Sequence, residues 1–282
     1  MALSFFKRNK NEERSEMSFI DHLEILRGHL FRSAIAVAIG AVIVGVYNKI
    51  FIQGILMGPT HSDFPTYKLL CRIGKALHIN RLCMEGIGIK MQSTTVSGQF
   101  SVFFNAVLIG GLIIAFPYVF LQFWNFTKPA LTKKELRNTR GVIFWVSLLF
   151  FLGVLFGYFV IAPYTVNFFA NFQLDANIEN RWTITSYINT LIPLILGTGL
   201  AFQLPLAIYF LSKIGIVSSA FLKKYRRHAY VIMLIVAGVI TPPDMLSQVI
   251  VTLPLVLLYE VSITLAKKVE RAEKEEEAKE WS

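Results

Sequence analysis

Charged residues are scarce in this chain. Asp, Glu, Lys and Arg make up 16% of its 282 residues, whereas hydrophobic residues make up 54%, and the mean hydropathy of +0.54 is too high for an ordinary soluble domain. The sequence has no Gly-rich phosphate loop, no G-x-S-x-G and no H-E-x-x-H motif, and its five histidines are scattered. It therefore encodes no recognisable site for nucleotide hydrolysis or a metal ion. We expect an integral membrane protein that is not an enzyme and has no cofactor.

Six apolar runs approach or reach the length needed to cross about 30 Å of hydrocarbon as helices. They lie at 30–52, 100–124, 142–163, 188–211, 229–241 and 249–266. No ten-residue segments alternate in the way that a transmembrane β-barrel requires. The predicted fold class is an all-α integral membrane protein with six transmembrane helices, of which the fifth and sixth are short.

The basic residues predict the orientation. Five Lys and Arg residues lie in each of four segments, namely 1–29, 125–141, 212–228 and 267–282. The three remaining connections together hold six, and they are 53–99, 164–187 and the turn 242–248. Because short loops rich in Lys and Arg stay cytoplasmic, we expect the four basic segments inside and the other three outside. A transmembrane domain, 30–266, then lies between two cytoplasmic termini, and the net charge of +10 requires no nucleic-acid partner.

The segment just before the first span has one apolar stripe at helical spacing, formed by Phe19, Leu23, Leu26 and Leu30. Glu24 and Arg27 stand beside it, one turn apart. This pattern predicts an amphipathic helix that lies on the inner membrane surface and runs into the first span. Acidic residues and the lack of an apolar core with a cleavage site indicate that the N-terminus is not a signal peptide.

Glu135 is the one acidic residue of the predicted inner loop 125–141. The loop also holds five basic residues, which are Lys128, Lys133, Lys134, Arg137 and Arg140. A lone carboxylate at a positively charged membrane surface is a candidate receptor for a cationic ligand. The alternative is a salt bridge to its basic neighbours, since exposed ion pairs are common and contribute only 0 to about 1 kcal/mol.

Both cysteines, Cys71 and Cys83, lie in the predicted outer loop 53–99. Thiols outside the bacterial inner membrane are oxidised, so a disulfide between them is plausible. Two free cysteines are the alternative, because the sequence does not fix the distance between their Cα atoms.

Several short motifs occur in a specific order along the chain. They are His22-Leu23-Glu24-Ile25-Leu26-Arg27 before the first span, Phe126 with Pro129-Ala130-Leu131 and Glu135 in the first inner loop, Pro205 in the fourth span, Thr241-Pro242-Pro243-Asp244 with Ser247-Gln248 between the fifth and sixth, and Pro59 and Glu260. Together they resemble the TatC subunit of the twin-arginine protein translocase. The resemblance runs from about residue 17 to residue 266.

This resemblance implies a TatC-like receptor in the bacterial inner membrane, with the thylakoid membrane the less favoured location. Such a receptor binds signal peptides with paired arginines and works with TatA-like and TatB-like single-span subunits and with other copies of itself. It uses the proton-motive force to move folded proteins outward. The resemblance assigns signal-peptide binding to Glu135, Glu24, Arg27 and Phe126, because a carboxylate can accept two parallel hydrogen bonds from a guanidinium.

The resemblance places partner docking at Thr241 and Gln248, at the outer end of the short fifth span, where polar side chains are expected to bind a partner helix by hydrogen bonds. Pro242-Pro243 prevents a helix from running through, so a tight outer turn capped by Asp244 is predicted.

Two positions depart from the family pattern. The usual motif is H-L-x-E-L-R, but here Glu24 stands one place early and Ile25 is where the acid is expected. One residue is about 100° around a helix, so Glu24 is expected to be a weaker contact. Gln203 stands where relatives often have Glu, and its amide cannot titrate. Its role is either partner docking or an ordinary hydrogen bond between helices.

A secondary transporter for a small solute is the alternative function. It would need ionisable groups near the membrane midplane and usually two repeated halves. Here Glu260 lies toward the inner end of the last span, and no internal repeat is visible. A third alternative, an assembly factor or membrane-embedded enzyme, lacks any catalytic constellation.

Overall fold

The computed structural model describes residues 19–78, 91–128, 141–175, 177, 180–242 and 244–280, without the side chains of 19–22, 273, 276, 277, 279 and 280. Over these residues nearly all of the chain is helical. Five helices are long and apolar enough to cross a membrane, and they are Leu23–Val46, Gly98–Thr127, Val142–Asn171, Ile184–Lys213 and Met245–Ala272. The predicted class, an all-α membrane protein, is confirmed.

The first crossing helix begins earlier than predicted. α1 (Phe19–Val46) is one uninterrupted helix, so the segment predicted as a separate surface helix forms its first turns. No proline interrupts the chain there, and apolar side chains continue into the span. At the end of α1 the chain turns at Tyr47 and forms η1 (Lys49–Leu56), a π-helix, and then η2 (Gly58–Thr60), a 3₁₀ turn.

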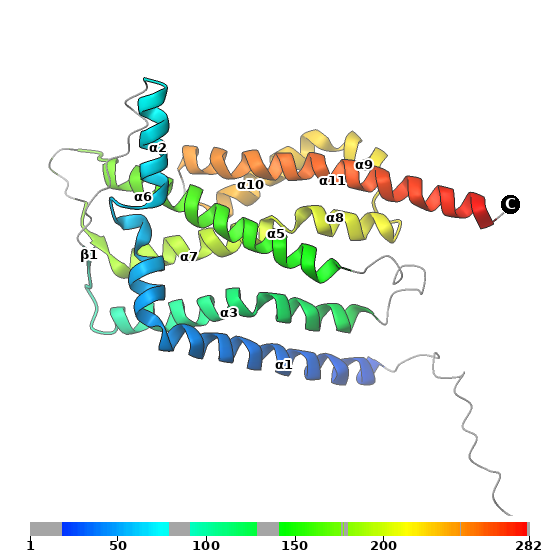
Figure 1. The fold of residues 1–282 in the computed structure, drawn as a ribbon, viewed down its shortest axis with the longest axis horizontal. Helices are drawn as coiled ribbons and strands as arrows, with labels where there is room; N and C mark the ends of the chain where they lie inside the picture. Colours follow the sequence, from blue (N-terminus) through cyan, green and yellow to red (C-terminus); the bar gives the residue numbers. More distant parts are fainter. Residues whose placement is uncertain are drawn as a thin grey trace, which may run out of the picture.

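The predicted outer loop 53–99 contains regular structure. α2 (Pro65–Ala76) begins with Pro65 in its first turn, where the missing N–H is harmless, and Figure 1 shows it standing across the direction of the other helices. Two short strands, β1 (Met91–Gln92) and β2 (Trp182–Thr183), pair in parallel at the same end of the molecule. Cys71 in α2 takes part in a disulfide. Cys83 lies outside the described residues, so their pairing stays a prediction.

The third crossing is longer than predicted. After α3 (Gly98–Thr127), the chain forms α5 (Val142–Phe156), a π-helical turn η5 (Gly157–Ile161) and α6 (Ala162–Asn171) in succession. The sequence predicts that the span ends at Pro163. This proline lies instead in the first turn of α6, which continues directly from η5. The carbonyl of Phe159, four residues before Pro163, accepts from the Thr66 hydroxyl. Helix therefore occupies part of the predicted outer loop 164–187.

The fourth crossing is broken into α7 (Ile184–Ala201) and α8 (Leu204–Lys213). Pro205 explains the break, because it has no N–H to donate to the carbonyl of Ala201, four residues earlier. Gln203 N instead bonds to the carbonyl of Leu200, three residues earlier, at 3.0 Å. Helical bonding resumes in α8.

The last two long helices, α10 and α11, differ greatly in length. After α9 (Ser219–Lys224), which lies in the predicted inner loop 212–228, α10 (Arg226–Ile240) has 15 residues and is about 22 Å long. α11 (Met245–Glu280) has 36 residues and is about 54 Å long. The helix at the predicted fifth span, α10, is short as expected and is not among the five helices long enough to cross a membrane. The helix at the predicted sixth span is not short. It begins directly after Asp244, before the predicted start at 249, and continues through the charged tail predicted from 267.

Figure 1 shows the long helices running side by side, with α1 beside α3 at one edge and α10 and α11 at the other. The beginning of α1 and the end of α11 lie at the same end of this bundle. The main core lies farther from α1, where α7 and α11 bury Ile188, Leu194, Val251 and Leu255.

Candidate functional site

α1 and α3 pack closely and antiparallel. A Cβ atom added to Gly40 would lie 2.6 Å from the carbonyl oxygen of Gly111, so both glycines are needed for this approach. Toward the beginning of α1, His29 Nδ1 lies 2.7 Å from Gln122 Oε1. Eleven residues separate Gly40 from His29 on α1, and eleven separate Gly111 from Gln122 on α3. The two contacts thus share one helical register.

This register gathers three of the predicted signal-peptide residues at one end of the bundle. Glu24 stands level with Thr127, the last residue of α3, and both Glu24 and Arg27 are exposed. The ring of Phe126 meets that of His29 edge to face, with 6.4 Å between ring centroids. The other two predicted residues of this region, Pro129 and Glu135, lie outside the described residues.

Glu24 points away from α3. His29 and Gly40 mark the face of α1 that contacts α3. Glu24 precedes His29 by five residues, which is about 140° around the helix, whereas Ile25 precedes it by four and is only about 40° away. The position where the family motif has its glutamate therefore lies on the side of α1 toward α3. In this chain Ile25 occupies that position, and its side chain is 39% exposed.

The end of α3 and the start of α5 are held together by a cluster around Trp124 that the sequence did not reveal. Trp124, in the last turns of α3, is only 6% exposed and packs with Val142 and Val146 of α5. Its ring lies 5.1 Å from that of Phe210 in α8. A tryptophan near the end of a span usually indicates an interfacial anchor, so its burial could not be predicted. Gly141 begins α5 with a φ of 90°, which suits glycine.

Gln203 connects the broken fourth crossing to α5. Its Nε2 donates to the carbonyl of Val146 at 3.1 Å. Its Oε1 is buried and has no hydrogen bond in the described part of the chain. Gln203 therefore makes the hydrogen bond between helices that was one of its two predicted roles. The other role, partner docking, stays a prediction.

Thr241 and Gln248 do not present two unpaired polar groups. Thr241 is 5% exposed, and its hydroxyl donates to the carbonyl of Ala237 in its own helix at 2.9 Å. Gln248 Nε2 donates across to the carbonyl of Leu234 in α10 at 3.0 Å. Gly238 leaves room for this amide, because a Cβ there would lie 2.9 Å from Gln248 Nε2. The Thr241 hydroxyl therefore already has an acceptor in its own helix, and partner docking at Thr241 and Gln248 stays a prediction.

The turn between α10 and α11 begins at Pro242 and is closed by Asp244. The Asp244 carboxylate accepts from the backbone N–H of Ser247 at 2.6 Å and so caps α11. The Ser247 hydroxyl lies 2.9 Å from that of Thr165 in α6, and both are buried. This contact connects the turn to the third crossing. Pro243 lies outside the described residues.

Glu260 has two partners at the other end of α10. Its carboxylate accepts from Arg226 Nη2 and from the Tyr230 hydroxyl, each at 2.6 Å. Farther along α11, Glu270 accepts from both the backbone N–H and the hydroxyl of Ser219 in α9. The two carboxylates therefore connect α11 to the segment containing α9 and α10.

Pro59 belongs to a cap, at the end of the bundle opposite the start of α1, in which tyrosine hydroxyls bind backbone carbonyls. Tyr67 donates to the carbonyls of Pro59 and Pro163, at 2.8 and 3.1 Å. Tyr187 donates to Leu56 at 2.8 Å, and Tyr158 donates to Ile55 at 2.7 Å. Burial raises the pKa of Tyr67 to about 12. We refer to Tyr67, Tyr158 and Tyr187 as the tyrosine cap.

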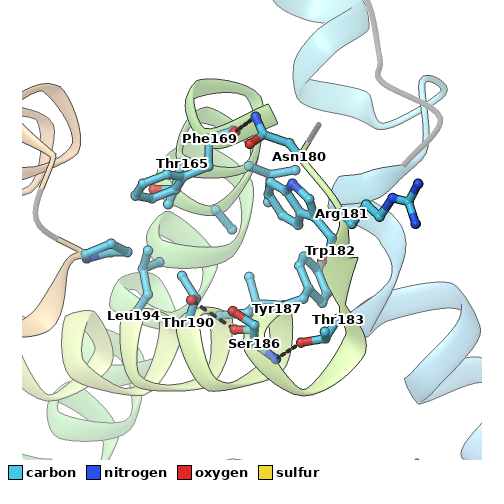
Figure 2. Close-up of a pocket in the computed structure, with 14 residues that line it drawn as sticks. Thr165, Phe169, Asn180, Arg181, Trp182, Thr183, Ser186, Tyr187, Thr190 and Leu194 are labelled. Carbon is cyan, nitrogen blue, oxygen red and sulfur yellow. Dashed lines mark hydrogen bonds between the residues drawn. The ribbon is translucent and has the colours of Figure 1, made fainter. Parts of the chain in front are cut away.

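A cavity of about 560 Å³ opens near the same end, between α6, β2 and the start of α7. Figure 2 shows Trp182, Tyr187 and Phe169 around it, while the side chain of Arg181 points away from its centre. Asn180 uses its amide to bind the carbonyl of Phe172 at 2.8 Å. The polar groups that line the cavity are thus largely engaged with the protein. Among the described residues, no three His, Cys, Asp or Glu side chains gather to hold a metal ion.

Long apolar helices joined by buried polar contacts define a multi-pass membrane protein. The family model described as Sec-independent protein translocase protein (TatC) matches residues 21–254. The chain belongs to this family, and it is a multi-pass protein of the bacterial inner membrane.

Similar proteins cover almost the whole chain. The Sec-independent protein translocase protein TatC of Blattabacterium sp. subsp. Periplaneta americana is 40% identical over 256 residues, which are 90% of this chain and 96% of that protein. The TatC protein of Desulforapulum autotrophicum is 34% identical over 92% of this chain and 87% of its own length. Two crystal structures of the twin arginine translocase receptor TatC match with TM-scores of 0.64 and 0.68, at 28% and 29% identity. They cover 88% and 87% of this chain, and 99% of each solved chain is matched.

Proposed function

We propose that this protein is the signal-peptide receptor and core scaffold of a twin-arginine translocase. It binds signal peptides with paired arginines at its inner face and recruits single-span subunits to export folded proteins on the proton-motive force. The names of its relatives support the translocase assignment. The observation that carries the receptor role is the α1–α3 register, which brings Glu24, Arg27 and Phe126 to the end where the segment containing Glu135 leaves α3.

The recognition end is proposed to be cytoplasmic. The start of α1 and the end of α11 lie at this end (Figure 1), and each terminal segment carries five Lys and Arg residues, which favours the inside. Six crossings, with the short α10 as the fifth, would return the chain to the same side. Reporter fusions after Asp175 should score outside and fusions after Arg137 inside. The reverse pattern would overturn this topology.

Charge explains why Glu135 is the proposed receptor for an arginine pair. It is the one carboxylate among five basic residues in 125–141, so a cationic peptide gains from this carboxylate and is repelled elsewhere in the segment. A guanidinium also offers two parallel hydrogen bonds to a carboxylate, which lysine cannot match. Glu24 is exposed on α1 but lies on the side away from α3, so we assign it a smaller contribution.

The test is crosslinking of a twin-arginine precursor to the full complex in membranes. Glu135→Ala should insert normally but lose most of the crosslinking, and Glu24→Ala should lose less. A matched control is Asp63→Ala, which removes an exposed carboxylate at the opposite end, where Asp63 pairs with Lys68 at 2.9 Å. A precursor with paired lysines controls for simple charge attraction. Normal binding by the Glu135 variant would refute the receptor site.

We propose that single-span partners dock beside α10 near Gln248. This side chain is partly exposed, and its amide oxygen has no hydrogen bond to the described residues. A polar side chain on a partner helix could donate to that oxygen, which is worth roughly 0.6 to 2 kcal/mol in a membrane. The 15-residue length of α10 supports the same surface, because a helix shorter than the hydrocarbon thickness favours association with other helices.

A further inference from the structure

The hydrogen bond between His29 and Gln122 is the one side-chain hydrogen bond that joins α1 to α3 in the portion of the chain that the structure describes. Gln122 is only 5% exposed, and an amide buried in hydrocarbon is costly unless it has a partner. Because an amide oxygen can only accept, His29 Nδ1 carries the proton of this bond. The pair therefore satisfies a polar group that has no access to water.

The close contacts between the two helices at their glycines have little directional preference. At the outer half, Gly40 faces Gly111, and Gly110 leaves room for the methyl groups of Val44, which would lie 3.2 Å from a Cβ atom added to this glycine. Close packing of this kind holds helices together in lipid but tolerates small rotations and shifts. A single buried polar pair, by contrast, specifies one register, as polar residues in otherwise apolar helical interfaces do.

The polar pair lies next to the proposed recognition residues. On α1, Arg27 and Glu24 precede His29 by two and five residues. On α3, Phe126 follows Gln122 by four residues, and its ring contacts the His29 ring at 6.4 Å between centroids. α1 packs mainly against α3, so little else sets the rotation of its first turns.

We infer that His29 and Gln122 are positioning residues for signal-peptide recognition. Their hydrogen bond fixes the rotation and height of the beginning of α1 relative to the end of α3, and so holds Glu24 and Arg27 in place relative to Phe126. This inference rests on the proposed receptor function. It requires no contact between either side chain and the peptide.

The test compares variants that remove, keep or exchange the hydrogen bond in the full complex in native membranes. His29→Ala and Gln122→Leu remove it. His29→Gln keeps a donor opposite Gln122, and the exchange variant with Gln at 29 and His at 122 restores the pair in reverse. Ser33→Ala is the matched control, because the Ser33 hydroxyl donates within α1 to the carbonyl of His29 at 2.9 Å and does not reach α3.

Two readouts are needed. Spin labels at Gly28 and Phe123, one residue from the pair on each helix, report the inner distance between α1 and α3. Labels at Val46 and Asn105, each six residues beyond the facing glycines, report the outer distance. Both distances are then compared with crosslinking of a twin-arginine peptide across a concentration series.

The two variants that remove the bond should broaden the inner distance distribution but not the outer one. They should also weaken apparent peptide affinity roughly three- to tenfold, in line with the strength of hydrogen bonds between membrane helices. His29→Gln, the exchange variant and Ser33→Ala should keep both readouts near those of the unchanged protein.

Several outcomes would overturn the inference. An unchanged inner distance would show that the bond does not set the register, and a broadened distance with full peptide affinity would show that the register does not matter for recognition. Failure of the receptor proposal would look different. In that case Glu135→Ala would retain peptide binding, whatever the two distances were.

Discussion

Replacing Gly40 with alanine should force α1 and α3 apart and destabilise the protein. The added Cβ would lie 2.6 Å from the carbonyl oxygen of Gly111 and 3.0 Å from its Cα atom, whereas ordinary contacts of a Cβ are 3.4–4 Å. The atoms that resist are backbone of a packed helix, so no side chain can rotate out of the way. The helices must separate by roughly 1 Å, which forfeits between a quarter and a half of the attraction between facing atoms.

The magnitude follows from a comparison within the same helix. Overpacking typically costs about 1–3 kcal/mol, while alanine gains up to about 1 kcal/mol over glycine in helix propensity. Gly45→Ala isolates the propensity gain, because its Cβ would lie 3.9 Å from a methyl group of Val107, an ordinary contact. We therefore expect Gly40→Ala to be less stable than Gly45→Ala by about 1–3 kcal/mol.

The assay is reversible unfolding in mixed detergent, which gives the free energy of unfolding of each variant. Gly111→Ala should behave like Gly40→Ala, and the double variant should cost less than the two single costs added, since the first substitution already separates the helices. Equal stability of Gly40→Ala and Gly45→Ala would mean that the helices do not approach as closely as described, and the register argument would fail with it.

Three further outcomes are expected. Gln248→Leu should reduce crosslinking to single-span partners, while Thr241→Val should leave it intact. The opposite result would mean that partners dock at Thr241 and not at Gln248. Glu260→Gln should lower the free energy of unfolding by about 1–3 kcal/mol. The double variant with Arg226→Gln should recover part of this loss, because it no longer leaves Arg226 as an unpaired charge. No recovery would argue against the ion pair. Tyr67→Phe should be destabilising below pH 10, where the Tyr67 hydroxyl is neutral in both the folded and the unfolded protein. Because the pKa of Tyr67 is raised to about 12 in the folded protein, the stability difference between the unchanged protein and the variant should shrink as pH rises from about 10 to 12. A difference in thermal stability that stays constant over this range would contradict the assignment.

The crossing helices were largely predictable because hydrophobicity and length report directly on residence in a membrane. Their ends were less predictable. Pro163 looked like a terminator but begins α6, since proline is accepted in the first turn of a helix. The charged residues after 267 are compatible in sequence with either a solvated helix or a disordered tail, and they continue α11. There Glu270 binds Ser219 of a segment about fifty residues earlier. Such contacts between distant segments leave no local signal.

The candidate site was only partly visible in the sequence for the same reason. The position of Glu24 in the motif suggested a weaker role, but its orientation relative to α3 required the contact between His29 and Gln122, which are 93 residues apart. The polar character of Thr241 and Gln248 was plain, yet polarity does not tell whether a group is already bonded. The hydroxyl of Thr241 satisfies its own helix, and only the folded arrangement shows this.

The tyrosine cap has a consequence for how the sequence can change over time. Its donors are side chains, but its acceptors are main-chain carbonyls of Ile55, Leu56 and Pro59, together with that of Pro163 for Tyr67. Every residue type supplies a carbonyl, so substitutions at positions 55 and 56 preserve the hydrogen bonds provided that the backbone keeps its path. The constraint falls instead on the three tyrosines, which sit on separate segments and must each reach one short stretch of chain. Substitutions should therefore be more frequent at the positions that supply the carbonyls than at the three tyrosines. The loss of one tyrosine cannot be compensated by a different side chain at the position of its acceptor.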